Sequence, residues 1–291
     1  MENGPGNGAI PPVAPDWNFT GVEDGGPAWA DATIICPWTV FLCYADKKIL
    51  EDHYASMRRF MAFLAEHRCL GYIRSHPEVD NWGGFGDWLA LDGSGALQGG
   101  TPRDLIGTAF YAYDAEIMAQ VAEILGHAEE AQCYRVLHEE IVKAFRRRFV
   151  TPEGLIAAKT QTAYVLALRF GLVPEENRAV AARELVRDIE RREFHLSTGF
   201  VGTPYLLEVL SANGYLDVAY KLLEQETFPS WIFPIKNGAT TIWERWDGWT
   251  PEKGVPDRHH ELVQPLRLWG GGGVDVPDPR RAGSRSRRAG A

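Results

Sequence analysis

The chain has 291 residues, of which 45% are hydrophobic and 24% are charged, a composition typical of a globular protein with one large domain or two small ones. Its formal net charge of −9 argues against a nucleic-acid partner, because phosphate binding needs clustered Lys and Arg. No apolar run approaches the roughly 18 residues that cross a bilayer, which argues against a membrane protein.

The first residues read as a loop and not as a targeting signal. Residues 1–15 are rich in Gly and Pro and lack the basic and apolar regions of a signal peptide. We therefore expect residues 1–25 to be a truncated entry segment of a domain that starts further upstream, and we expect a cytoplasmic protein. The four cysteines show no CxxC pair, so we expect buried, reduced thiols and not a zinc site or a disulfide framework.

Helical periodicity dominates from about residue 31 to residue 226, where apolar side chains recur at three- and four-residue steps. No alternating pattern predicts a strand, so the fold class is all-α. The predicted helices cover residues 32–45, 49–67, 106–124, 128–149, 160–170, 174–192, 204–210 and 216–226.

The connections between these helices alternate in length. Short turns join the two helices of a pair, whereas longer Gly-rich and aromatic segments lead to the next pair, at residues 75–103, 151–159, 194–202 and 228–249. This rhythm favours helical hairpins arranged in a ring, with the long loops at one rim. A TPR-type solenoid is the alternative, but no fixed repeat of about 34 residues is present.

Two loop segments place a carboxylate beside an indole. Residues 26–32 read Gly-Pro-Ala-Trp-Ala-Asp-Ala, so Asp31 follows Trp29 where a helix begins. A second pair, Asp87 and Trp88, lies in the longest loop. Each carboxylate alone could be only a helix cap or a turn residue. Together the pairs suggest an aromatic, acidic pocket suited to a neutral carbohydrate.

The third loop carries the most informative string, Gly-Ala-Thr-Thr-Ile-Trp-Glu-Arg-Trp-Asp-Gly-Trp at residues 238–249. It surrounds Glu244 with Trp243, Arg245, Trp246 and Trp249. Sugar C–H groups stack on indole faces while sugar hydroxyls bond carboxylates and arginine, so this composition suits a sugar site. A carboxyl walled by indoles also tends to have a raised pKa, which suits acid–base catalysis. The alternative is a core lid around a buried Glu–Arg pair.

Residues 195–203, His-Leu-Ser-Thr-Gly-Phe-Val-Gly-Thr, lack the G-x-S-x-G elbow and the P-loop lysine. We expect Ser197 or Thr198 to cap the next helix, with Gly199 and Gly202 allowing close backbone packing. The Thr-Gln-Thr at residues 160–162 either points polar groups toward the same rim or is a simple helix start.

These motifs, in this order, resemble the catalytic domain of bacterial α-L-rhamnosidases. The resemblance covers roughly residues 26–251 and rests on residues 29–32, 86–88, 160–164, 195–204 and 238–249. It implies an (α/α)6 barrel of six helical hairpins that hydrolyses terminal α-L-rhamnosides with inversion. Rhamnose-containing glycosides would be its partners, with no metal, organic cofactor, nucleic acid or membrane involved.

In inverting glycosidases, one carboxylic acid protonates the leaving oxygen while a second carboxylate, about 6.5–9.5 Å away, activates water. The resemblance implies that Glu244 is this general base. It also implies that Trp29 and Trp88 stack on the sugar, with Asp87 adjacent. We expect the remaining substrate contacts from Asp31, Trp243, Arg245 and Trp246.

The sequence departs from the family pattern at both ends. Nothing between residues 1 and 27 matches the general-acid motif of the family, so we expect an incomplete barrel that is inactive by itself. Residues 26–253 would form this partial barrel. Residues 254–291 lose helical periodicity and become basic, and we expect an aberrant or disordered tail. We hypothesise a reading-frame shift just before His260; a natural basic tail is the alternative.

Two other functional classes stay open at this point. A non-catalytic carbohydrate-binding helical module would keep the tryptophans and carboxylates without turnover. Another (α/α)6 enzyme, such as a glucosidase or a lyase, would share the ring, but the strings at residues 195–204 and 238–249 argue against it.

Overall fold

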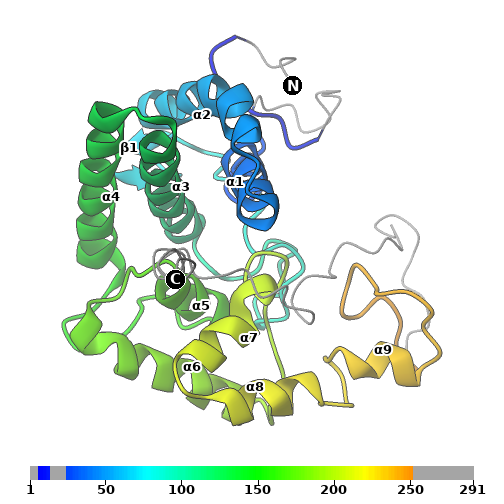
Figure 1. Ribbon diagram of the computed structural model, residues 1–291. Helices are drawn as coiled ribbons and strands as arrows, with labels where there is room; N and C mark the ends of the chain where they lie inside the picture. Colours follow the sequence, from blue (N-terminus) through cyan, green and yellow to red (C-terminus); the bar gives the residue numbers. More distant parts are fainter. Residues whose placement is uncertain (1–5, 14–23, 252–291) are drawn as a thin grey trace, which may run out of the picture.

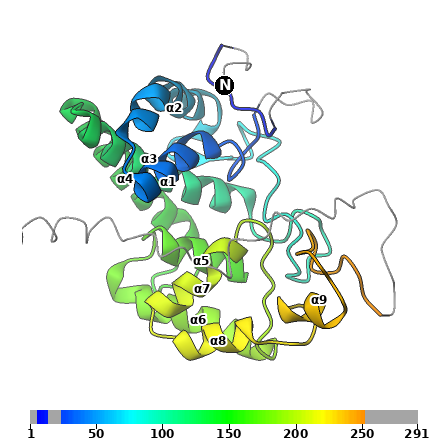
Figure 2. The same cartoon turned by 45° about the vertical axis from the view of Figure 1, so that its right-hand side comes forward.

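The computed structural model describes residues 6–13 and 24–251 and consists mainly of helical hairpins that follow one another along an arc (Figure 1). The hairpins are α1 (Ala32–Tyr44) with α2 (Lys47–His67), α3 (Arg103–Leu125) with α4 (Ala128–Phe149), α5 (Gln161–Arg169) with α6 (Arg178–Arg191), and α7 (Thr203–Ala212) with α8 (Leu216–Leu223). A short helix, α9 (Ile232–Lys236), follows at the end of the arc, apart from the hairpins (Figure 2).

The all-α prediction is confirmed, and each predicted helix overlaps an observed one. Two details differ. A small antiparallel pair, β1 (Cys69–Leu70) and β2 (Ile73–Arg74), precedes α3. A strand of two residues is too short to show an alternating apolar pattern in the sequence. Pro174 precedes a 3-10 turn, η1 (Glu175–Asn177), and α6 begins only after this turn.

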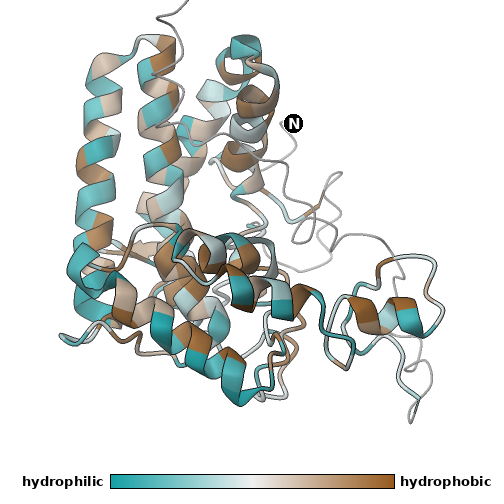
Figure 3. Cartoon of the chain, turned by 60° about the horizontal axis from the view of Figure 1, so that its bottom comes forward, coloured by the Kyte–Doolittle hydropathy of each residue, from teal (hydrophilic) through white to brown (hydrophobic). Residues whose placement is uncertain are grey.

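The first helices of the four hairpins, α1, α3, α5 and α7, form one continuous layer. Helix α1 packs on α3, α3 on α5, and α5 on α7. Helices α3 and α5 are buried over most of their surface, whereas α4 and α6 bury one apolar stripe each. Figure 3 shows the corresponding distribution, with polar residues on the outward sides of the helices. This inner and outer arrangement is that of a ring wall, in which the inner helices meet each other and the outer helices cover them.

Local signals explain where several helices start and end. Gly126 ends α3 with a φ of 84°, and its N–H donates to the carbonyls of Ala122 and Glu123. A left-handed residue at this position favours glycine. At the start of α5, the Thr160 hydroxyl accepts the Ala163 N–H at 3.3 Å. The long connections 75–102, 150–160 and 192–202 all lead into the starts of inner helices, so they gather at the same end of the ring.

The described part of the entry segment packs against α2. Ala9 is buried, and a Cβ on Gly8 would lie 2.4 Å from the Arg59 carbonyl oxygen. The Gly25 N–H donates to the Ile10 carbonyl at 2.7 Å. The predicted tail at residues 254–291, with the hypothesised frame shift, lies outside the described residues. Within the part that is described, no helix is both long and apolar enough to cross a membrane.

All four cysteines are free thiols, as expected, but the expectation that they are buried is wrong for three of them. Cys36 and Cys43 lie on the exposed side of α1, Cys133 is exposed on α4, and Cys69 is half-buried. Scattered cysteines carry no positional signal of their own, so only helix packing decides which face they take.

A buried ionic cluster lies beneath the start of α1. Asp31 is fully buried, and its carboxylate pairs with the Arg74 guanidinium through one oxygen and accepts the Ala28 N–H at 2.6 Å through the other. The Arg74 guanidinium also lies 5.7 Å from the centre of the Phe60 ring. The side chain of Asp31 makes no helix-capping hydrogen bond in α1. With both oxygens bonded to the protein, Asp31 is placed as a structural ion-pair partner, which differs from the predicted sugar contact.

Asp114, on α3, is the second carboxylate of this cluster and is much less well satisfied. It lies 3.8 Å from Arg74, and neither of its oxygens accepts a hydrogen bond from a donor among the described residues. Burial, followed by the neighbouring negative charge of Asp31, raises the pKa of Asp114 well above its usual range. A neutral Asp114 can donate its proton to the Asp31 carboxylate, and this form suits the site best.

We predict that replacing the two carboxylates of this cluster changes the free energy of unfolding by very different amounts. Asp31→Asn should lower the free energy of unfolding by about 3–5 kcal/mol, because it removes the charge that pairs directly with the buried Arg74 guanidinium. Asp114→Asn should cost less than about 1 kcal/mol at pH 4, where the wild-type side chain is neutral, because an amide mimics the neutral acid. Urea unfolding of both variants and the wild type measures the difference. Equal losses for the two variants would contradict the prediction.

The same cluster makes the stability of the wild type depend on pH. Because the pKa of Asp114 is raised in the folded state, its contribution is fully present below about pH 4, the unfolded value, and is lost as the pH rises through the raised pKa. Asp114→Asn removes this loss. Unfolding curves measured from pH 4 to pH 9 should therefore converge at the acidic end and separate at the basic end, with the variant more stable.

Candidate active site

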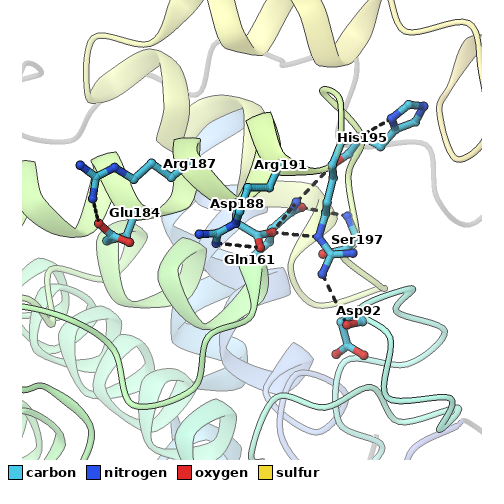
Figure 4. Close-up of polar contacts among 9 residues, drawn as sticks. Asp92, Gln161, Glu184, Arg187, Asp188, Arg191, His195 and Ser197 are labelled. Carbon is cyan, nitrogen blue, oxygen red and sulfur yellow. Dashed lines mark hydrogen bonds and ion pairs between the residues drawn. The ribbon is translucent and has the colours of Figure 1, made fainter.

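The loop at residues 195–202 lies in the middle of the predicted site and is held first by a buried amide (Figure 4). Gln161, in the first turn of α5, is fully buried. Its Nε2 donates to the His195 carbonyl at 3.2 Å and to Asp188 Oδ2 at 3.1 Å, and its Oε1 accepts the Ser197 N–H at 2.8 Å. Both alternatives for residues 160–162 hold in part, because Thr160 caps α5 whereas the polar groups of Gln161 and Thr162 reach the rim loops.

A buried carboxylate holds the other half of this loop. Asp87 accepts the Gly199 N–H at 2.8 Å on Oδ2, and the Val201 and Gly202 N–H groups at 2.8 and 3.2 Å on Oδ1. The Thr162 hydroxyl also donates to Oδ2. Burial raises the pKa of Asp87 above its usual range, while these four donors oppose that shift. Asp87 thus faces protein donors on both oxygens, and no side of it is open to a sugar hydroxyl.

Asp87 lies just before the next helix, where the sequence predicts a side-chain cap. The N-cap of α7 is Gly202, which has no side chain, so the expected Ser or Thr cap is wrong. The Asp87 carboxylate instead accepts N–H groups just ahead of the first turn of α7, where the helix dipole favours negative charge. The expected close packing of both glycines is confirmed. A Cβ would lie 2.2 Å from the Trp88 carbonyl at Gly199, and 2.4 Å from the Thr162 hydroxyl at Gly202.

The aromatic side chains of these loops form one cluster around Phe85. Its ring centre lies 4.8 Å from Trp29, 5.1 Å from Trp82 and 6.0 Å from Trp88. Trp29 also lies 6.4 Å from Phe200 in the 195–202 loop. All five rings are half-buried, so they keep some surface for a ligand. The structure therefore brings Trp29 and Trp88 into one cluster, although they are far apart in the sequence.

The segment with Glu244 joins the same loop through Trp246. The Trp246 indole is buried, and its Nε1–H donates to the Thr198 carbonyl at 2.9 Å. Its ring lies edge-on to Trp231 at 5.6 Å between centres. Glu244 itself is half-buried, two residues before this anchor. The predicted meeting of this segment with the other rim loops is thus seen at Trp246.

The remaining predicted residues of this segment are partly engaged with each other. Trp243 and Trp249 lie 6.4 Å apart between ring centres. Arg245 forms a two-bonded ion pair with Asp247, with both N–O distances at 3.0 Å. The indoles of Trp243 and Trp249 are half-buried and available as apolar surface, whereas the buried indole of Trp246 serves as an anchor.

Sequence reasoning missed Phe85 and Phe200 as members of the aromatic cluster, and it did not assign Gln161 and Thr162 as holders of the loop. Phe200 lies inside the motif at residues 195–203 and Phe85 directly precedes the motif at residues 86–88. Each lies beside a glycine that permits close packing, which is a signal that could have singled them out. Gln161 and Thr162 carried a weaker signal, since polar residues at a helix start are common.

The functional groups that the described loops bring to the site are carboxylates, indoles and backbone N–H groups. Across residues 6–13 and 24–251, no group of three or more His, Cys, Asp or Glu side chains is placed to hold a metal ion. Half-buried indoles beside a half-buried carboxylate suit the apolar faces and hydroxyls of a sugar.

Comparison of the sequence with known families supports this chemistry. The family model described as the bacterial alpha-L-rhamnosidase 6 hairpin glycosidase domain matches residues 1–269. An α-L-rhamnosidase of Streptomyces avermitilis is 41% identical over 284 residues, which cover 96% of this chain and 26% of that protein. An α-L-rhamnosidase of Formosa agariphila is 40% identical and is covered to the same 26%. The chain therefore spans about a quarter of the length of these relatives.

Comparison of the structure leads to the same group. The crystal structure of the Streptomyces avermitilis enzyme complexed with L-rhamnose superposes with a TM-score of 0.78 and 40% identity, over 87% of this chain and 23% of that one. The enzyme of Aspergillus terreus superposes with a TM-score of 0.77 and 27% identity, over 90% of this chain and 29% of that one. The predicted ring of helical hairpins is confirmed, with the described hairpins forming part of it. The chain belongs to the six-hairpin glycosidase family of the bacterial α-L-rhamnosidases.

Proposed function

We propose that this chain is the part of a glycoside hydrolase that binds terminal α-L-rhamnosides and activates the attacking water. The observation that carries the proposal is the hydrogen bond from Trp246 to Thr198, which joins the Glu244 segment to the loop beside Trp88. The complex of the Streptomyces avermitilis relative with L-rhamnose supports the choice of sugar.

In this proposal Glu244 acts as the general base of an inverting reaction. Its carboxylate accepts a proton from water while that water attacks the anomeric carbon. The half-buried indoles of Trp29 and Trp88 offer flat surfaces for the C–H groups of the deoxysugar. Trp243 and Arg245 stand next to the base, where they can contact the ring and its hydroxyls.

The inverting reaction also needs an acid that protonates the leaving oxygen, and no motif of this chain matches the family's general acid. We therefore expect the 291-residue chain alone to bind L-rhamnose without efficient hydrolysis. General acid catalysis typically contributes about 10²–10⁴-fold in rate, so its loss leaves little turnover.

The second candidate function is a carbohydrate-binding module without catalytic activity. It keeps the same aromatic cluster and the same Glu244 but requires no partner acid. The two candidates differ in what happens when the upstream sequence of the gene is restored. A binding module stays inactive, whereas the proposed hydrolase gains activity.

The first test measures p-nitrophenol release from p-nitrophenyl α-L-rhamnoside. We expect little or no release by the 291-residue chain and clear release by a longer polypeptide that includes the upstream helices. Proton NMR of the first turnovers should show β-L-rhamnose as the initial product, because inversion changes the anomeric configuration. Efficient hydrolysis by the short chain would contradict the missing acid, and initial α-L-rhamnose would contradict inversion.

The second test replaces the proposed base. Glu244→Gln in the longer polypeptide should lower kcat by about 10²–10⁴-fold, because the amide cannot accept a proton, while KM changes little. Glu224→Gln, an exposed residue beyond the end of α8, is the matched control and should leave both constants unchanged. An unchanged kcat in Glu244→Gln would reject this residue as the base.

A further inference from the structure

Both carboxylate oxygens of Asp87 are enclosed by protein donors. It is fully buried, and its bonds reach residues more than 70 positions away along the chain. A direct contact with a sugar hydroxyl would require one of these bonds to break. The influence of Asp87 on the site must therefore pass through the groups that it holds.

One of those groups leads directly to Trp246. The Gly199 N–H that donates to Asp87 and the Thr198 carbonyl that accepts from Trp246 belong to the same peptide unit. A trans peptide is planar, and its N–H and C=O point in opposite directions. The carboxylate and the indole thus lie at the two ends of one rigid plane. Each bond also polarises this plane in the sense that strengthens the other.

The surroundings prevent this peptide plane from turning. Gly199 has no room for even a Cβ, because the Trp88 and Asp87 carbonyl oxygens would lie 2.2 and 2.6 Å from it. The Leu91 N–H donates to the Ser197 carbonyl at 2.9 Å, and the Phe200 N–H donates to the Trp88 carbonyl at 2.9 Å. The peptide plane between Thr198 and Gly199 is therefore fixed from both flanks.

We propose that Asp87 is a positioning residue that holds Trp246, through the Thr198–Gly199 peptide, and so sets the place of the neighbouring Glu244. Without the carboxylate, three backbone N–H groups before α7 lose their acceptor, and the peptide plane loses the charge that orients it. Trp246 then loses a fixed acceptor for its indole N–H. The step from Trp246 to Glu244 rests on the proposed function, whereas the step from Asp87 to Trp246 does not.

The test follows the indole N–H resonance of Trp246 in proton–nitrogen NMR spectra of the 291-residue chain, assigned by its disappearance in Trp246→Phe. Asp87→Asn should move this resonance toward the position of a solvent-exposed indole and speed its exchange with water. L-Rhamnose binding, measured by titration, should weaken about tenfold, the effect of losing roughly one hydrogen bond to the sugar.

Two further variants separate positioning from a general loss of stability. Asp80→Asn is the matched control, because Asp80 is a buried carboxylate of the same long loop that accepts the Trp82 and Gly83 N–H groups and has no bond to the 195–202 loop. It should lower the melting temperature and leave the Trp246 resonance in place. Thr162→Val removes a single donor from Asp87 and should shift the resonance, whereas Thr162→Ser restores the hydroxyl and the wild-type spectrum.

The outcomes distinguish the two proposals. An unshifted Trp246 resonance in folded Asp87→Asn and Thr162→Val overturns the positioning role; if Asp87→Asn does not fold, Thr162→Val alone decides. A shift of the same size in Asp80→Asn also overturns it. If the wild type binds no L-rhamnose, the proposed function fails, and the indole resonance still decides whether Asp87 holds Trp246.

Discussion

The carboxylate of Asp87 and the backbone that it binds are the contact on which the rest of the site depends. The loop at residues 195–202 is largely buried, but its backbone N–H groups have no acceptors of the kind that a helix or a sheet provides. Side chains must supply the acceptors instead. Asp87 takes the Gly199, Val201 and Gly202 N–H groups, and Gln161 takes that of Ser197. The aromatic cluster and the Trp246 anchor are both built onto this loop.

The ring architecture explains why such distant segments meet. Each inner helix begins where a long connection ends, and the inner helices stand side by side in one layer. The connections therefore gather at a common rim, whatever their separation in the sequence. The relatives of known structure share this arrangement over most of the present chain. In the proposed hydrolase the rim loops supply the base and the tryptophans that stack on the sugar. The packed inner helices hold these residues in place relative to each other.

Two buried carboxylates of this protein illustrate how much the surroundings decide. Asp87 collects four donors and is well placed as an anion. Asp114 has no donor among the described residues and stands beside Asp31, so its neutral form is favoured. The two residues have the same chemistry and are both fully buried. The difference lies in whether donors, most of them backbone N–H groups, point toward the side chain and in whether a second carboxylate lies beside it.

The helices were largely readable from the sequence, because their apolar period and their ends are local properties. Gly126 ends α3, and Thr160 starts α5, each through contacts within four residues. The order of the motifs was sufficient to indicate the family, and the presence of indoles beside carboxylates was sufficient to indicate a sugar site. The two-residue strands β1 and β2 were not predicted, because strands of this length show no alternating apolar pattern.

Only the tertiary structure decided the roles of the individual carboxylates. Asp31 pairs with Arg74, which lies 43 residues away in the sequence. Asp87 accepts a hydrogen bond from Gly199 over 112 residues, and Trp246 donates one to Thr198 over 48 residues. Periodicity and local propensity carry no record of such pairs, because they arise when helices from different hairpins close into one wall. The sequence by itself determined which segments are helical and which chemistry the loops offer. The packing of the ring determined which acids became structural and left Glu244, at the half-buried edge, as the candidate base.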